Sequence, residues 1–318
     1  MTSAAAPPSL THQSSRPLGD PIFRGVCFGA ATLLLAALGG LLISLVIGGW
    51  PAFAKFGFGF LTSTTWNPVT EVYGAAGPIA GTLITSFLAL ALALPVALGV
   101  AVFLTEFCPR AISGPLAVTL ELLAGIPSIV YGMWGLFVFA PFFAMHVQMP
   151  LMMAAPPGSI WEKLVTGIPN GANILTASII LAIMILPYMS AVFRELLRTV
   201  PPQLREASYG LGCTPLETVW SVMLPYVRRG SIGVVMLGLG RALGETMAVT
   251  FIIGNAHGLP KNLFASGATL ASTIANEFTE ATGEMHTSAL IALGLVLFLI
   301  TFSVLALARA LLPTQSHS

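Results

Sequence analysis

Residues 78–104, PIAGTLITSFLALALALPVALGVAVFL, contain no charged side chain. A bilayer core is crossed by about 20 apolar residues in helical conformation, so this run is long enough to span a membrane. Five other runs are similarly long and predominantly apolar. The sequence therefore predicts an all-α polytopic membrane protein with six transmembrane helices, at Val26–Gly48, Pro78–Leu104, Pro115–Ala140, Ile174–Val192, Ile232–Ile253 and Ser288–Ala308.

The composition supports a lipid environment and excludes other classes. The chain is 56% hydrophobic and only 8% charged, whereas a soluble domain carries about 25% charged residues. A formal net charge of +1 argues against nucleic acid as a partner. The three cysteines are scattered and form no CxxC or Cys/His spacing, so we expect no metal and no cofactor.

The basic residues predict the orientation of the six spans. Cytoplasmic loops of membrane proteins carry an excess of Lys and Arg. With both termini in the cytoplasm, only Lys55, Lys163 and Lys261 lie outside, and Arg241 lies within a span. The remaining basic residues then lie inside: Arg16, Arg24, Arg110, Arg194, Arg198, Arg205, Arg228, Arg229 and Arg309.

Individual residues within the spans and in the outer segments lead to further structural predictions. Three prolines inside the spans should kink their helices or open backbone groups: Pro95, Pro127 and Pro187. Trp50 and Trp66, in the first outer segment, are expected to anchor at the membrane interface. In the last outer segment, Glu277, Glu280 and Glu284 are expected to form a solvated face or a receptor contact. Met145, His146, Met149, Met152 and Met153 of segment 141–173 predict an amphipathic interfacial segment rather than a soft-metal site.

Residues 201–226 form a polar, helix-forming stretch between two apolar runs. Pro201-Pro202 can open a helix and Gly212 can close it in a left-handed cap. Thr214-Pro215-Leu216-Glu217 has the form of a capping box that starts a second helix. The sequence predicts helix, sharp turn and helix, with the second helix ending near Pro225.

This stretch resembles the EAA loop of bacterial ABC importer permeases. The family pattern is EAA, three residues, Gly, nine residues and Ile-x-Leu-Pro. Ser208 replaces the second alanine and Val222 replaces the isoleucine. The resemblance implies a cytoplasmic EAA-type coupling helix pair that docks on the ATP-hydrolysing subunit, through Glu206, Ala207, Gly212, Leu224 and Pro225.

Two charged residues, Arg241 and Glu245, lie deep in the fifth predicted span. A charged residue at such depth is costly and normally faces the bundle interior or a water-filled path. Residues four apart share a helix face, so the two side chains are expected to reach each other. The pair is either a structural ion pair or part of an anion path, in which Arg241 matches phosphate oxygens and Thr246 and Thr250 add hydroxyl donors.

Residues 238–249, GLGRALGETMAV, followed by Ile253-Gly254-Asn255, resemble phosphate-specific ABC importer permeases, most of all the PstC-type subunit. Three other stretches resemble segments of the same family: ELLAGIPSIVYG at 121–132, Thr62–Pro68 and Tyr73-Gly74. The likeness covers most of residues 60–310. It implies a phosphate path through Arg241 and Glu245.

The resemblance also implies partners and domain bounds. The partners are a sister permease of the PstA type, two ATP-binding subunits and an extracytoplasmic phosphate-binding protein, in the lipid bilayer of a bacterial inner membrane. Residues 23–312 form the ABC transporter type-1 transmembrane domain. Residues 1–22 are expected to be a disordered cytoplasmic tail and residues 313–318 a cytoplasmic C-terminal tail.

Other functions remain open at this point. No G-x-x-x-x-G-K-[ST] phosphate loop is present, so hydrolysis must come from a partner and the chain is not expected to be an enzyme. A permease for phosphonate, sulfate or molybdate is the first alternative. An ion-coupled secondary transporter is disfavoured because no repeat is found, and an intramembrane enzyme because no buried catalytic constellation is found.

Overall fold

The computed structural model describes residues 19–310, which are mostly helical and contain no strand within that range. Six of the described helices are long and apolar enough to cross a membrane: Pro21–Phe56, Ala76–Phe107, Ser128–Ala154, Ile174–Arg198, Pro215–Leu243 and Glu284–Ala310. The predicted all-α class and number of spans are confirmed. The predicted terminal tails lie largely outside the described residues, although the first helix already begins at Gly19.

The chain divides into a unit that ends at Ile47 and a unit that begins at Gly48. The first unit consists of most of α1 (Gly19–Phe56), a single long apolar helix with Pro51 inside its last part. The second unit contains the last turns of α1 and all the other elements.

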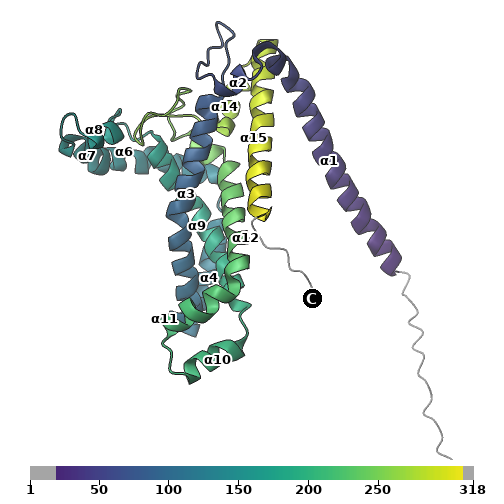
Figure 1. Ribbon diagram of the computed structural model, residues 1–318, viewed down its shortest axis with the longest axis vertical. Coiled ribbons are helices and arrows are strands. Elements are labelled where there is room, and N and C mark those ends of the chain that lie inside the picture. The colour runs from purple at the N-terminus through teal and green to yellow at the C-terminus, as the bar shows by residue number, and fades with distance from the viewer. Residues whose placement is uncertain (1–18, 311–318) are drawn as a thin grey trace, which may run out of the picture. The chain divides into compact units, whose positions relative to one another are not determined.

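In the second unit, α3 (Ala76–Val102), α9 (Ile174–Arg198) and α12 (Leu224–Leu243) run side by side (Figure 1). Four buried alanines of α3 lie one helical turn apart, and their small side chains let α9 approach closely: Ala89, Ala93, Ala97 and Ala101. Large apolar side chains of α9, such as Ile180, Ile185 and Met189, belong to the same buried cluster, with Met189 next to Gly238 of α12. This alanine-to-aliphatic packing forms the main core.

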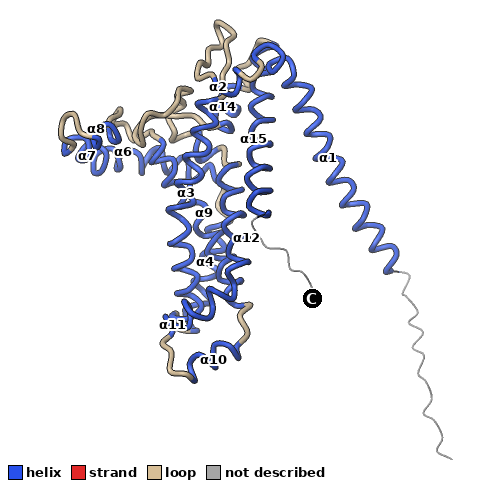
Figure 2. Tube along the Cα trace, in the orientation of Figure 1, coloured by secondary structure: helices blue, strands red, loops and turns tan. Residues whose placement is uncertain are grey.

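Helices and loops cover both ends of the core (Figure 2). At one end lie α10 (Pro202–Gly210) and α11 (Pro215–Thr218). At the other end α2 (Gly59–Thr62), α14 (Leu270–Glu277) and the first turns of α15 (Glu284–Ala310) pack around Tyr73. There a Cβ on Gly81 would overlap the carbonyl oxygen of Ala268, so glycine lets the loop before α14 cross α3.

The third predicted span, Pro115–Ala140, is wrong as a single helix. The structure has α4 (Arg110–Ala124), a break at Gly125–Pro127, and a continuous helix from Ser128 to Ala154. Pro127 supplies no N–H and disfavours helical backbone in the residue before it, so α4 ends there. The second helix comprises α5 (Ser128–Trp134), α6 (Ala140–Phe143) and α7 (Met149–Ala154), joined by the π-helical turns η2 (Gly135–Phe139) and η3 (Ala144–Gln148).

Segment 141–173 is helical over most of its length, in α6, η3, α7 and α8 (Ile160–Val165). Met152 packs on a small cluster around Phe143, while Met145 and Met153 are exposed. The His146 ring stacks on Phe142, and no metal-binding group of side chains occurs in the described chain.

The predicted end of the second polar helix near Pro225 is also wrong. The helix runs on from α11 through the π-helical turn η4 (Val219–Met223) into α12, with Pro225 in the first turn of α12. A π-helical turn inserts one extra residue. η4 ends two residues before Pro225, which lacks the N–H that a regular helix would use at this position.

Candidate translocation path and coupling surface

Arg241 lies at the end of a helix inside the bundle. α12 ends at Leu243, Gly244 caps it, and the short α13 (Met247–Thr250) follows after Thr246. The fifth predicted span is therefore not one helix to Ile253. Irregular backbone at this depth is stable only where protein buries it or where it lines a cavity. The break thus makes the segment after Arg241 a candidate for a polar path.

The guanidinium group of Arg241 lies over an aromatic ring rather than beside Glu245. Its Cζ atom is 5.4 Å from the centre of the Tyr188 ring, and its Nε is buried without a hydrogen-bond partner among the described residues. No ion pair joins Arg241 to Glu245 in the described chain. The expected contact fails because α12 ends between the two residues, so the four-residue helical spacing no longer applies.

The three polar residues after Arg241 are occupied by local backbone contacts. Glu245 accepts a hydrogen bond from the Ala248 N–H at 3.2 Å, which caps α13. The Thr246 hydroxyl donates to the Gly244 carbonyl at 3.4 Å, and the Thr250 hydroxyl donates to the Thr246 carbonyl at 2.7 Å. The two hydroxyls are therefore not free donors here, contrary to the expectation from sequence.

Arg241 also faces open space. It lines a groove of about 640 Å³ between α12 and α15, together with Gly240, Thr301 and Arg309. Most of the groove lining is apolar, so its dielectric constant is low. The positive charge of Arg241 therefore attracts an anion in the groove more strongly than it would in water. Of the predicted path residues, Arg241 has both accessible space and an unused N–H.

Tyr188 is a site residue that sequence reasoning missed. It lies in the middle of α9, far from Arg241 along the chain, and its neighbours in sequence are apolar. No local motif signals it. Only the packing of α9 against α12 places the ring under the guanidinium group.

At the α10 end, the turn between α10 and α11 forms as the sequence predicts. Pro201 caps α10, Gly212 has a φ of +85°, and Thr214 and Glu217 form a reciprocal capping box. A Cβ on Gly212 would meet no atom within 4 Å, so its left-handed backbone alone demands glycine.

The predicted coupling residues lie on this exposed turn or just after it. Glu206, Ala207, Gly212 and Pro225 are exposed, and Leu224 is half-buried against the core. Large apolar side chains lie exposed on the same helices: Leu204, Leu211, Leu216 and Trp220. Several large apolar side chains exposed on neighbouring turns are typical of a protein interface.

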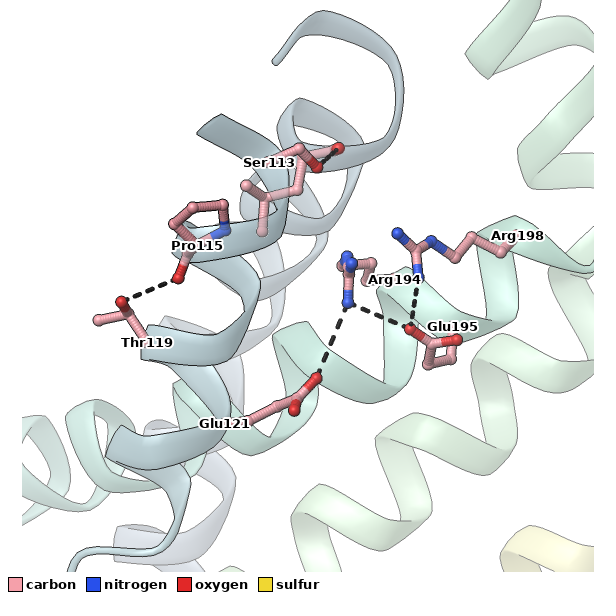
Figure 3. A network of polar contacts seen from close by, with 8 residues as sticks. Ser113, Pro115, Thr119, Glu121, Arg194, Glu195 and Arg198 are labelled. Atoms are coloured by element: carbon pink, nitrogen blue, oxygen red, sulfur yellow. Dashed lines mark hydrogen bonds and ion pairs between the residues drawn. The ribbon is translucent and has the colours of Figure 1, made fainter. Parts of the chain in front are cut away.

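An ion-pair network braces α4 against α9 near this end (Figure 3). Arg194, which is buried, contacts Glu195 at 3.1 Å and Glu121 of α4 at 3.8 Å. Glu195 also pairs with Arg198 at 3.1 Å. The contact between Arg194 and Glu121 thus links α4, which is too short to span the bilayer, to α9 close to the break at Gly125–Pro127.

At the opposite end, Glu277 is not on a solvated face, which corrects the expectation from sequence. Its two carboxylate oxygens contact His257 Nε2 at 2.9 Å and His286 Nε2 at 2.8 Å. The Trp66 indole N–H donates to the same carboxylate at 2.8 Å, so Trp66 is a partner in this cluster. Burial raises the pKa of Glu277, but the hydrogen bonds from these three groups outweigh burial and lower it. Glu280 and Glu284 are exposed.

The bundle, with its exposed helix pair at one end, has the fold of an ABC importer permease. The structure of the MetNI methionine ABC transporter aligns with a TM-score of 0.54 at 18% identity, over 77% of this chain and 99% of that chain. A bacterial alginate ABC transporter aligns with a TM-score of 0.58 at 16% identity, over 92% of this chain and 96% of that chain. At these identities the likeness concerns the fold.

The chain belongs to the family of binding-protein-dependent transport system inner membrane components, which its residues 97–317 match. Relatives named phosphate transport system permease protein PstC are 54% identical in Mesorhizobium japonicum, over 93% of this chain and 90% of the relative, and 51% identical in Haemophilus influenzae, over 94% and 95%. A relative of the same name in Xylella fastidiosa is 45% identical over 100% and 99%. The chain is thus a multi-pass membrane transport subunit of an ABC importer and not an enzyme.

Proposed function

We propose that this chain is the permease subunit of an ATP-driven importer of inorganic phosphate. The observation that carries the proposal is Arg241 at the end of α12, with an unpartnered Nε and a groove beside it, in a chain more than half identical to a phosphate transport permease. A guanidinium group matches the oxygens of phosphate in a bidentate manner. Other oxyanions are the alternatives that the experiment below separates.

In this proposal Arg241 meets the anion and Tyr188 holds Arg241. The guanidinium carbon lies over the ring, 5.4 Å from its centre, and this contact leaves the hydrogen-bonding capacity of the guanidinium group for an oxyanion. Glu245, Thr246 and Thr250 act indirectly, because they shape the backbone between α12 and α13 that permits the path.

The proposed partners are a sister permease of the PstA type, two ATP-binding subunits and an extracytoplasmic phosphate-binding protein. The groove beside Arg241 and the outward face of α15 suit a sister subunit that completes the path. The exposed turn around Gly212 suits the ATP-binding subunit, with Glu206, Ala207, Leu224 and Pro225 on or beside the contact. This assignment places both termini in the cytoplasm.

The test is transport by the complete complex in proteoliposomes, with labelled phosphate, sulfate and molybdate offered separately. We expect ATP-dependent accumulation of phosphate and little of the other two. Accumulation of sulfate or molybdate in preference to phosphate would assign the chain to another oxyanion. Uptake that follows an ion gradient without ATP would assign it to the secondary transporters.

A further inference from the structure

Arg205 of α10 forms hydrogen bonds to the ends of two membrane-spanning helices, α3 and α9. Its Nη1 donates to Glu106 Oε1 at 2.8 Å, and its Nη2 donates to the Leu197 carbonyl of α9 at 2.6 Å. Glu106 lies in the π-helical turn η1 (Phe103–Phe107), which ends the α3 helix. One guanidinium group on the exposed helix pair therefore bridges the ends of α3 and α9.

The Glu106 side chain is only 7% exposed, and the Arg205 side chain 22%. Tyr209, one turn further along α10, donates its hydroxyl to the second oxygen of Glu106 at 3.2 Å. Burial and the nearby charge of Glu106 raise the pKa of this tyrosine, so it stays a hydrogen-bond donor at neutral pH. A carboxylate this shielded is stable only while its partners remain.

The other side-chain link of α10 leads to α11. The hydroxyls of Ser208 and Thr218 lie 2.9 Å apart and are buried. The rest of α10 is largely exposed. A displacement of α10 thus reaches α11 and η4 through Ser208, and reaches α3 and α9 through Arg205.

Two of the elements that α10 contacts adjoin π-helical turns, whereas α9 ends as regular α-helix. Glu106 lies in η1, and η4 follows α11 directly. Such turns are rare, bond residue i to residue i+5, and occur frequently at functional sites. The Glu106 end of α3 thus departs from regular α-helical hydrogen bonding, which suits a contact that moves.

We propose that the Arg205–Glu106 pair is the joint that carries movement of the docked ATP-binding subunit from α10 to α3 and α9. The inference rests on the proposed coupling role of this turn. It assigns Arg205, Glu106 and Tyr209 as positioning residues and not as contacts of the ATP-binding subunit or of phosphate. A contact that transmits movement can be distinguished from one that only stabilises the fold. Loss of the transmitting contact lowers the phosphate transported per ATP hydrolysed in a complex that still assembles.

The test measures phosphate transported per ATP hydrolysed by the complete complex in proteoliposomes, together with retention of the ATP-binding subunit. The variants are Arg205→Gln, Glu106→Gln and the charge-swapped pair Arg205→Glu with Glu106→Arg. We expect each single variant to retain the ATP-binding subunit and to lose about tenfold in phosphate per ATP, a typical size for coupling between sites. The swapped pair should recover a large part of that loss, although the contact to the Leu197 carbonyl is gone.

Arg198→Gln is the matched control. Arg198 lies at the same end of α9 and forms an ion pair of 3.1 Å with Glu195, but its side chain is 50% exposed and the pair lies within one helix. Exposed pairs contribute little. Its phosphate-per-ATP ratio should equal that of the unaltered complex.

Unchanged ratios in both assembled single variants would overturn the proposal, as would a swapped pair that assembles but stays as uncoupled as the singles. If the charge variants do not assemble, Arg205→Lys decides, because lysine keeps the charge but has no fork to reach Glu106 and Leu197 together. A normal ratio in Arg205→Lys contradicts the joint, and a lowered ratio supports it. Failure of the unaltered complex to carry phosphate would instead contradict the proposed function, and the ratio would then be measured with the anion that it does carry.

Discussion

Arg241 and Tyr188 lie together in the middle of the bundle, with the guanidinium carbon 5.4 Å from the centre of the ring. The contact joins the last turn of α12 to the middle of α9. It positions the guanidinium group without using its hydrogen bonds, which distinguishes Arg241 from Arg194, whose carboxylate partners are Glu121 and Glu195.

Replacement of Tyr188 tests this contact. Tyr188→Leu removes the ring, and we expect the KM for phosphate to rise roughly 2- to 30-fold, since cation–π contacts contribute about 0.5–2 kcal/mol. Tyr188→Phe keeps the ring and should remain near normal. Uptake kinetics of the reconstituted complex measure both, and equal kinetics for the two variants would contradict a role for the ring.

Arg241→Lys should lower phosphate uptake by about 10- to 100-fold, because charge-assisted hydrogen bonds contribute about 1.5–3 kcal/mol and a point charge does not reproduce the fork. Uptake by complexes of verified assembly is the measurement. Normal uptake would mean that the guanidinium geometry has no part in transport.

The double variant Arg241→Leu with Glu245→Leu separates the anion path from a structural ion pair. In the structure Glu245 caps α13 and does not pair with Arg241, so removal of both charges should not restore transport. We expect an assembled but inactive complex. Near-normal phosphate uptake by the double variant would show that the two charges serve only each other.

Gly212→Val should uncouple the complex, because a β-branched residue resists the φ of +85° and strain in this region costs about 1–3 kcal/mol. Gly212→Asn is the matched control, since asparagine tolerates the left-handed conformation. The readout is phosphate-stimulated ATPase activity and retention of the ATP-binding subunit. Full stimulation in the valine variant would argue against a role for this turn.

The orientation is tested by labelling single cysteines in a chain whose Cys27, Cys108 and Cys213 have been replaced. Lys163→Cys should react with an impermeant reagent added outside, and Arg198→Cys should react only after the membrane is opened. The reverse pattern would place the α10–α11 turn outside the cell and remove the basis of the coupling proposal.

Glu277 predicts an acid dependence of stability. Hydrogen bonds from His257, Trp66 and His286 outweigh the effect of burial and lower the folded-state pKa below its usual value of 4.5. The carboxylate therefore contributes stability above that value and loses it as the pH falls through the lowered folded pKa. Thermal unfolding of the purified protein should show Glu277→Gln as less stable at neutral pH, with the difference shrinking below about pH 4. A difference that does not depend on pH would contradict the charged form as the stabilising species.

The sequence by itself determined the class of the protein, the number of spans and the turn between α10 and α11. Span number follows from apolar length, and the turn follows from Gly212 and the Thr214–Glu217 capping box, so both depend on short stretches of chain. Local chemistry decides such features because their partners are only a few residues away.

Only the tertiary structure decided which prolines end a helix and what Arg241 contacts. Pro95 and Pro187 remain inside α3 and α9, while the chain breaks at Pro127, because packing against neighbouring helices determines whether a disturbed helix continues. Arg241 and Glu245 are four residues apart, but α12 ends between them, and a ring from a distant helix takes the place expected for the carboxylate. Side-chain spacing predicts a contact only where the helix that sets the spacing is continuous, and that continuity depends on the rest of the bundle.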